Sequence, residues 1–151
     1  PLTCDCPKPM VRLLDRPVME YSLMLLARHG VTEAAVTLGY LPKRICDYFG
    51  PSAHGISLSY FWEKTPLGTA GGVAQAREML TETFCVLSGD GVTDCDLTKA
   101  LAFHREKGAL ATMVLSRTAD PTPYGLVITA PDGHITDLWK SPPGARWFPT
   151  R

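Results

Sequence analysis

The stretch ISLSYFWEKTPLGTAGGVAQAREML, residues 56–80, joins a strand pattern to a helix pattern through a glycine-rich turn. Apolar and polar residues alternate over 56–62, which is typical of a β-strand with one buried face. The glycines let the backbone approach a flat or anionic ligand closely, and the helix predicted over 71–80 offers free N–H groups at its start. The turn is therefore either a ligand-binding loop or simply a tight connection.

The same alternation of short apolar runs and amphipathic runs continues along the chain. Helices are also predicted over 17–30, 42–50 and 96–108, and strands over 33–38, 83–88, 109–117 and, around a hairpin turn at 131–134, within 124–140. Asp96 is a candidate N-cap, and Gly108 a candidate C-terminal stop. Strands that alternate with helices predict a three-layer αβα fold with a mainly parallel, Rossmann-like sheet.

Composition limits the classes of protein to consider. A chain of 151 residues with 45% hydrophobic content can bury one core, so we predict a single domain over 1–151. Fifteen basic residues balance fifteen acidic ones, which argues against a general nucleic-acid or membrane surface. Since no apolar run approaches the roughly 18 residues of a spanning helix and no leader pattern opens the chain, we predict a cytoplasmic protein.

Cysteine and histidine spacing argues against a structural metal centre. The five cysteines are odd in number and scattered, which favours reduced thiols over a disulfide framework. Cys4-Asp5-Cys6 lacks the second Cys or His pair that a zinc site needs. The histidines show no ligand spacing either, and we expect all four to be solvated: His29, His54, His104 and His134.

The stretch VLSGDGVTDCDL, residues 86–97, places three carboxylates after a predicted buried strand. Ligands of parallel α/β sheets bind beyond the carboxyl ends of the strands, where Asp90 is expected to lie. A carboxylate there needs a lysine or a divalent cation as partner, and Mg²⁺ held by a carboxylate and substrate phosphates fits. The alternative is that Asp90 stabilises the turn, while Asp94 and Asp96 are expected to cap the turn and the next helix.

The stretch PKPM, residues 7–10, offers such a cation. Prolines on either side of Lys8 forbid helix and hold the backbone extended, so the ammonium group is presented from a stiff segment. A compact charge on a stiff segment suits phosphate binding, although a solvated loop lysine is the alternative. The glycine-rich turn itself matches neither the G-x-G-x-x-G dinucleotide fingerprint nor the P-loop, which argues against a nicotinamide-dependent oxidoreductase.

Four motifs in this order resemble the sugar-phosphate nucleotidyltransferase family: PLT…PKPM (1–10), PLGTAGG (66–72), LSGD (87–90) and YGLV (124–127). AVTLGYLP (35–42), DYFG (47–50) and TDCDL (93–97) make the chain most similar to mannose-1-phosphate guanylyltransferases, including variants fused to a phosphomannomutase-like domain. The resemblance implies the nucleotide-diphospho-sugar transferase fold. It also implies that mannose-1-phosphate attacks the α-phosphorus of GTP with Mg²⁺ as cofactor, giving a nucleotide sugar and pyrophosphate.

The resemblance also implies roles for individual residues. Asp90 matches the metal-binding aspartate, and Lys8 matches the lysine that faces the phosphates, so both are candidate catalytic residues. Tyr124 and Gly125 match a pair whose glycine lies against the sugar. The loop that reads the base through its backbone is matched by Leu67, Gly68, Thr69, Ala70 and Gly71.

The chain departs from the family pattern at both ends. The family carries a Gly-Thr-Arg-Leu loop and a central strand just before Pro-Leu-Thr, where this sequence begins, and an Asn-Thr-Gly pattern and a second metal-binding aspartate beyond its last residue. We therefore expect a fold truncated at both ends and inactive by itself. An exposed central strand leaves unpaired backbone groups that favour association, and a homo-oligomer is compatible with this expectation.

A third departure lies within the chain. The family's Glu-Lys-Pro, which holds the sugar and its phosphate, falls on Lys140, Ser141 and Pro142. A lysine cannot accept hydrogen bonds from sugar hydroxyls, although Lys140 remains able to reach the sugar phosphate. A non-catalytic regulatory module that binds sugar nucleotides is therefore an alternative to the enzyme.

Overall fold

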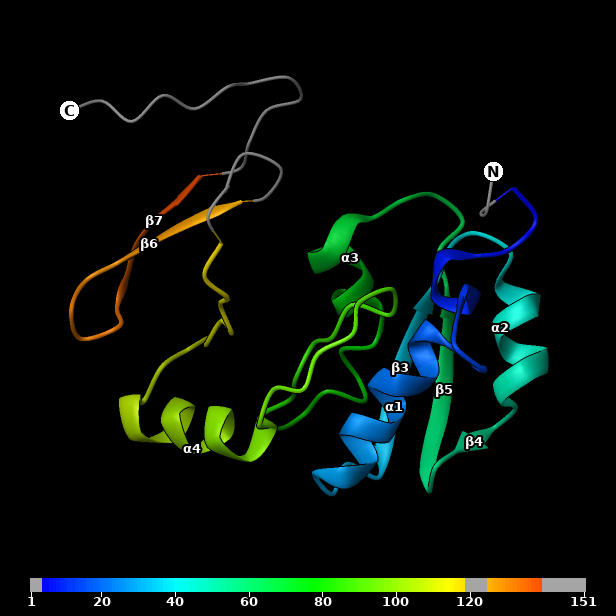
Figure 1. Ribbon diagram of the computed structural model, residues 1–151, viewed down its shortest axis with the longest axis horizontal. Helices are drawn as coiled ribbons and strands as arrows, with labels where there is room; N and C mark the ends of the chain where they lie inside the picture. The colour runs from blue at the N-terminus through cyan, green and yellow to red at the C-terminus, as the bar shows by residue number, and fades with distance from the viewer. Residues whose placement is uncertain (1–3, 119–124, 140–151) are drawn as a thin grey trace. The chain divides into compact units, whose positions relative to one another are not determined.

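The computed structural model describes residues 4–118 and 125–139. The chain divides into two compact units, Pro1–Thr112 and Met113–Arg151, and each unit is described by itself (Figure 1). No helix among the described residues is both long enough and apolar enough to cross a bilayer. The single domain over 1–151 stays a prediction.

A three-stranded sheet in the order β3-β5-β4 forms the centre of the first unit. Strand β3 (Glu33–Leu38) runs parallel to β5 (Ile56–Trp62), and the short β4 (Ser52–Ala53) runs antiparallel to β5. Leu38 pairs with Trp62, so the two parallel strands end side by side. Both strands were predicted from the sequence, and both are confirmed.

Helices α1 (Val18–Arg28) and α2 (Pro42–Phe49) pack with this sheet around the core. In the first half of β5, Ile56 and Leu58 are buried and the serines beside them are exposed, as the alternating pattern predicted, whereas Trp62 at its end is exposed. On α1 the buried residues recur at helical spacing, which gives the helix one apolar face. The core consists of Met19, Leu23, Leu38, Ile45, Phe49, Ile56 and Leu58.

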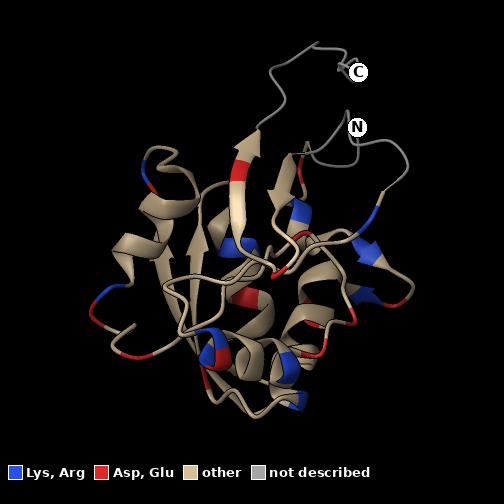
Figure 2. Cartoon of the chain, turned by 90° about the vertical axis from the view of Figure 1, so that its left-hand side faces the viewer, with Lys and Arg blue, Asp and Glu red and all other residues tan. Residues whose placement is uncertain are grey.

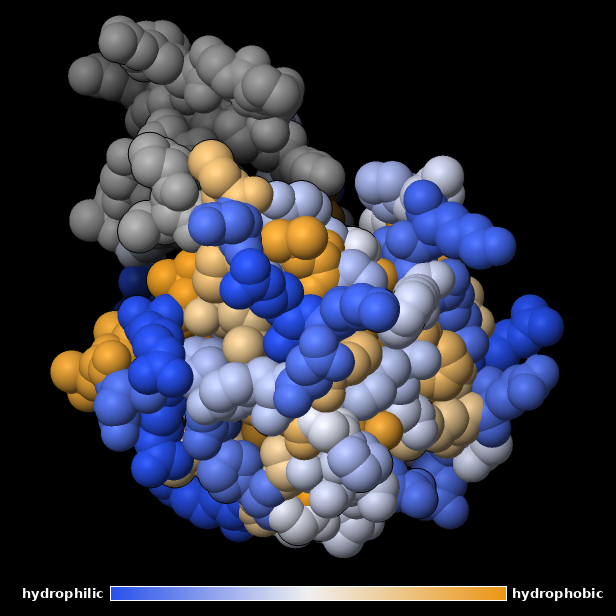
Figure 3. Space-filling view, turned by 90° about the vertical axis from the view of Figure 1, so that its right-hand side faces the viewer, coloured by the Kyte–Doolittle hydropathy of each residue, from blue (hydrophilic) through white to orange (hydrophobic). Residues whose placement is uncertain are grey.

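The segment before α1 is short and irregular. Lys8 opens a 3₁₀ helix, η1 (Lys8–Met10), so the prediction that its flanking prolines forbid helix is wrong. Pro9 lies in the first turn, where a proline is tolerated because the missing N–H has no helical partner there. A two-stranded ribbon of β1 (Arg12–Leu13) and β2 (Arg16–Pro17) follows. The face of the first unit that carries α2 shows mostly hydrophilic side chains with scattered apolar ones (Figure 3). In a second view, positions of lysines and arginines alternate along the ribbon with positions of acidic residues (Figure 2).

Helix α4 (Leu97–Lys107) begins and ends as the sequence predicted. The Asp96 side chain accepts a hydrogen bond of 3.0 Å from the Lys99 amide, which makes Asp96 the N-cap. Gly108 ends the helix in the left-handed conformation, with φ of 56°. Capping residues therefore located this helix correctly.

Three predicted elements differ from the structure. The strands predicted over 83–88 and 109–117 are not formed. A strand requires a hydrogen-bonded neighbour, and Phe84 and Val86 are about half exposed, at 48% and 57%, rather than buried. The helix predicted over 71–80 begins and ends earlier, as α3 (Gly68–Gln75). After Gln75 the backbone hydrogen bonds span three residues instead of four, as in the 3.0 Å bond from the Ala76 amide to the Val73 carbonyl.

The second unit contains an antiparallel hairpin of β6 (Leu126–Thr129) and β7 (Ile135–Trp139). Its turn is closed by a 3.0 Å bond from the Gly133 amide to the Ala130 carbonyl, and Gly133 has φ of 89°. The Asp132 side chain accepts a bond from the His134 amide at 3.0 Å. The predicted hairpin is therefore confirmed, whereas Tyr124 and Lys140 lie outside the described residues.

Candidate functional site

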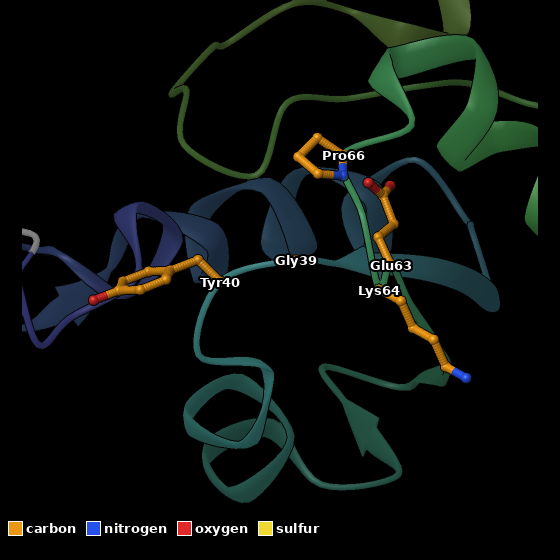
Figure 4. A pocket seen from close by; sticks show the side chains of 5 residues that line it. All are labelled: Gly39, Tyr40, Glu63, Lys64 and Pro66. Atoms are coloured by element: carbon orange, nitrogen blue, oxygen red, sulfur yellow. The ribbon is translucent and has the colours of Figure 1, made fainter.

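A pocket of about 290 Å³ lies beyond the carboxyl ends of β3 and β5 (Figure 4). Gly39 and Tyr40 follow β3, and Glu63, Lys64 and Pro66 follow β5; these five residues line the pocket. Because β3 and β5 are parallel and end side by side, the segments that follow them meet at one edge of the sheet. The edge at which a ligand was expected therefore carries a pocket.

Glu63 is a candidate residue that the sequence analysis missed. Its Oε2 accepts a 3.2 Å hydrogen bond from the Leu67 amide, and its own amide donates to the Leu38 carbonyl at 2.7 Å. In Figure 4 its side chain points toward the segment of Pro66, whereas that of Lys64 points away from it. A carboxylate directly after β5 is the same signal that drew attention to Asp90.

Glycine residues let this carboxylate and the loop Leu67–Gly71 lie close together. A Cβ atom on Gly72 would lie 2.7 Å from Glu63 Oε1, and one on Gly71 would lie 2.6 Å from the Leu67 Cβ. Gly68 has φ of 70°, which favours glycine. Residues 67–70 are exposed. In the structure Leu67 is the N-cap of α3 and residues 68–71 form its first turn, so the segment predicted to read the base is an exposed helix start next to Pro66 of the pocket.

The segments that carry Lys8 and Asp90 are neighbours in the fold, although they lie far apart in the sequence. A Cβ atom on Gly89 would lie 3.5 Å from Pro9 Cγ, which is ordinary van der Waals distance. Lys8 opens η1, and Asp90 lies in the turn after Gly89; both side chains belong to exposed residues. The fold thus brings a lysine segment and an aspartate segment to one place, as a phosphate and metal site requires.

Asp90 lies in an exposed turn and not at the end of a buried strand. The Ser88 hydroxyl donates to Asp90 Oδ1 at 2.5 Å, and the Gly91 amide bonds to the Ser88 carbonyl at 3.5 Å. The surroundings were therefore predicted wrongly, because the strand over 83–88 is not formed. Asp90 takes part in the turn, as the structural alternative held, and its carboxylate is accessible to a ligand.

Among the described residues, no group of three or more His, Cys, Asp and Glu side chains could hold a metal ion. A cage made only of protein ligands is therefore not available in that part of the chain. Mg²⁺ is commonly held by one or two carboxylates together with substrate phosphates. Asp90, a hard oxygen ligand in an exposed turn beside the Lys8 segment, fits that mode of binding.

The neighbouring titratable groups have structural roles. The hydrogen bond from the Lys99 amide lowers the pKa of Asp96, in agreement with its predicted capping role. All five cysteines are free, as predicted. The prediction that every histidine is solvated is wrong for His29, whose Nδ1 lies 2.8 Å from Thr98 Oγ1 and whose Nε2 is buried without a partner.

Gly125 lies in the second unit, where it lines a pocket of about 360 Å³ between β6 and the segment 115–118. A Cβ atom on Gly125 would lie 3.6 Å from the Trp139 carbonyl oxygen. That is ordinary van der Waals distance, so the packing of the hairpin does not itself require glycine at this position. Its proposed partners in sugar binding, Tyr124 and Lys140, are not among the described residues.

Comparison with known proteins identifies the family. A family profile described as nucleotidyl transferase matches residues 1–146. A UTP–glucose-1-phosphate uridylyltransferase of Synechocystis sp. is 36% identical and aligns with 94% of this chain and 40% of its own length. A mannose-1-phosphate guanylyltransferase catalytic subunit beta of Dictyostelium discoideum is 35% identical and aligns with 85% and 37%, respectively.

Solved structures show the same fold. HddC from Yersinia pseudotuberculosis superposes with a TM-score of 0.73 at 22% identity, over 91% of this chain and 61% of its own. A UDP-glucose pyrophosphorylase from Acinetobacter baumanii superposes with a TM-score of 0.70 at 18% identity, over 95% and 63%. The fold is therefore the nucleotide-diphospho-sugar transferase type that the motifs predicted.

The chain spans about two fifths of the length of the curated relatives it matches. Within that span the fold, the order of the motifs and the family profile agree. The chain therefore belongs to the nucleotidyl transferase family, among enzymes of the sugar-phosphate branch.

Proposed function

We propose that the protein transfers a nucleotidyl group from a nucleoside triphosphate to a sugar-1-phosphate. The observation that supports this most is the proximity of the Lys8 and Asp90 segments, which are neighbours at Pro9 and Gly89. The family adds its support, because the two relatives described above are both named for sugar-1-phosphate substrates. A phosphate oxygen of the sugar attacks the α-phosphorus, and the bond from that phosphorus to the pyrophosphate breaks.

The residues of this chain would contribute mostly position and charge. Lys8, on its stiff segment, neutralises phosphate oxygens, and Asp90 binds Mg²⁺ together with those oxygens. When bound, Mg²⁺ supplies further positive charge to the phosphates. The backbone of the loop Leu67–Gly71 holds the base, so that the α-phosphorus faces the sugar phosphate. Reactions of this class depend chiefly on such positioning and charge neutralisation.

We favour GTP and mannose-1-phosphate as the substrates. Glu63 supports guanine, because a carboxylate accepts hydrogen bonds and the edge of guanine offers two adjacent donors, N1–H and N2–H₂, whereas uracil offers one. The relative named for UTP and glucose-1-phosphate makes those the competing pair. On the sugar side we assign Tyr124 and Gly125 from the motif match, and Lys140, which stands where the family carries Glu, as a residue able to reach the sugar phosphate.

The test is a panel of reactions with the intact protein that contains this chain. Pyrophosphate should be released only when a triphosphate, a sugar-1-phosphate and Mg²⁺ are all present. The kcat/KM for GTP with mannose-1-phosphate should exceed that for UTP with glucose-1-phosphate by about tenfold or more. A preference for UTP would contradict the assignment of the base, and no release with any pair would contradict the enzyme.

A regulatory module that binds sugar nucleotides without turnover is the second candidate. The lysine and serine at positions 140 and 141, where the family carries Glu and Lys, favour it. Calorimetry distinguishes the two functions, because the module should bind a nucleotide sugar in the absence of any pyrophosphate release. A cytoplasmic location, a homo-oligomer and fusion to a phosphomannomutase-like domain stay predictions.

A further inference from the structure

Two polar contacts join helix α1 to the segment that follows Asp90. The Ser22 hydroxyl donates to the Gly91 carbonyl oxygen at 3.2 Å. Seven residues further on, at the C-cap of α1, His29 Nδ1 lies 2.8 Å from Thr98 Oγ1, at the start of α4. Positions seven apart lie on one face of a helix, about 10 Å from each other along its axis. One face of α1 therefore holds the segment 91–98 at both ends.

Ser22 is unusual for a helix residue. Among the described residues it is the only buried polar one, with 7% of its surface exposed. A serine within a helix commonly bonds to the carbonyl four residues before it, whereas Ser22 bonds to a carbonyl distant in the sequence. Because a buried hydroxyl without a partner is costly, the bond ties the Gly91 backbone to the core of the first unit.

The turn that carries Asp90 has few other attachments of this kind. Residues 83–95 form neither helix nor strand, so no ladder of backbone bonds holds them. The bonds of Ser88 to Asp90 and of Gly91 to Ser88 fix the turn internally. They do not fix it relative to the sheet. Within the described part of the chain, the Ser22 bond is the one hydrogen bond that joins residues 83–95 to another segment, and Pro9 is a close neighbour of Gly89.

We infer that Ser22 is a positioning residue for Asp90, with His29 holding the far end of the same segment. This inference rests on the proposed role of Asp90 as the ligand of Mg²⁺. Ser22 acts by fixing the Gly91 carbonyl, the backbone group directly after the aspartate. Loss of its hydroxyl should free the turn without removing any ligand, so metal binding should weaken while the reaction at saturating metal continues.

Hydrogen exchange of the intact protein tests the structural half of this inference. In the Ser22→Ala variant, amides of residues 88–95 should exchange roughly three- to tenfold faster than in the wild type. The control is Ile45→Val, a cavity-forming change in the core on α2, away from the turn. Should Ser22→Ala fail to fold, Ser22→Cys keeps the volume and replaces the hydroxyl by a weak donor, and the same acceleration is expected.

Metal dependence tests the functional half. In Ser22→Ala the Mg²⁺ concentration for half-maximal pyrophosphate release should rise about threefold or more, with kcat at saturating Mg²⁺ nearly unchanged. In an Asp90→Asn background the same change should have no further effect, because the two residues act as one unit. Ile45→Val should leave the metal dependence as it is in the wild type.

The outcomes separate this inference from the proposed function. Exchange and metal dependence in Ser22→Ala that match those of Ile45→Val overturn the positioning role. If Asp90→Asn leaves the Mg²⁺ dependence unchanged, the proposed metal role of Asp90 fails, and the positioning role fails with it. Faster exchange in Ser22→Ala would then show that the bond holds the turn for stability alone.

Discussion

At the scale of single residues, close contacts at glycines connect the candidate base loop to Glu63. The hydrogen bond between the Leu67 amide and Glu63 Oε2 requires the carboxylate to lie against the first turns of α3. Gly72 allows this, because it has no Cβ to occupy the space that Glu63 Oε1 fills. Gly72 therefore leaves room for Glu63 to take its position in the pocket wall, although Gly72 itself has no side chain.

We expect Gly72→Ala to impair nucleotide binding more than folding. The new Cβ would lie 2.7 Å from Glu63 Oε1, and the flexible end of that side chain can move away, so the free energy of unfolding should change by no more than about 1 kcal/mol. The KM for the triphosphate should rise about three- to tenfold with kcat nearly unchanged, in steady-state kinetics. A second variant, Glu63→Gln, tests whether Gly72→Ala acts through the Glu63 carboxylate. If the two changes in KM are additive in the double variant, the two residues act independently and this explanation is wrong.

The chemistry of their side chains points to the candidate site residues, but their spacing along the sequence does not predict which of them lie close together in the fold. Lys8 and Asp90 were chosen from the chemistry of phosphate and metal binding and from a family resemblance. Their segments are neighbours at Pro9 and Gly89, which spacing along the chain does not reveal. The role of Ser22 could not be predicted either, because a serine in an apolar helix pattern gives no sign of a distant carbonyl partner.

At the scale of elements, local capping signals predicted helices better than apolar patterns predicted strands. Asp96 and Gly108 bound α4 as expected, because an N-cap and a left-handed C-terminal residue act within a few residues. The apolar runs at 83–88 and 109–117 are strand-like in sequence, yet each needs a neighbouring strand in the right register. Among the described residues neither run has such a neighbour, and a pattern along the chain cannot supply that information.

The Asp96 cap makes α4 sensitive to pH. The bond from the Lys99 amide lowers the pKa of this carboxyl below its ordinary 3.8, so its contribution to stability is present above that pH and is lost as pH falls through the folded pKa. Asp96→Ala should therefore lower the Tm of the intact protein by a few degrees at pH 7, in thermal unfolding followed by circular dichroism.

The matched control for the cap is Asp94→Ala, which removes a nearby exposed carboxylate. We expect it to leave the Tm close to that of the wild type. The difference between Asp96→Ala and the wild type should shrink toward pH 3, because protonated Asp96 is a poorer acceptor. A difference that stays constant from pH 7 to pH 3 would show that the charge of Asp96 does not contribute.

At the scale of the whole molecule, the candidate site draws on segments from most of the first unit. The turn of Asp90 depends on α1 and η1, while the pocket and the loop Leu67–Gly71 depend on the parallel pair β3 and β5. The fold class and the family could be predicted from the sequence, because four ordered motifs and the alternation of elements agree. The surroundings of Asp90 could not, because they follow from which strands find partners.

We propose that Asp90, held beside the Lys8 segment, binds the metal for nucleotidyl transfer. The decisive measurement is pyrophosphate release by the intact protein with GTP, mannose-1-phosphate and Mg²⁺, compared between Asp90→Asn and Asp94→Asn. Asp90→Asn should lose activity on the order of a hundredfold or more, and Asp94→Asn should change little. Equal rates in the two variants would contradict it.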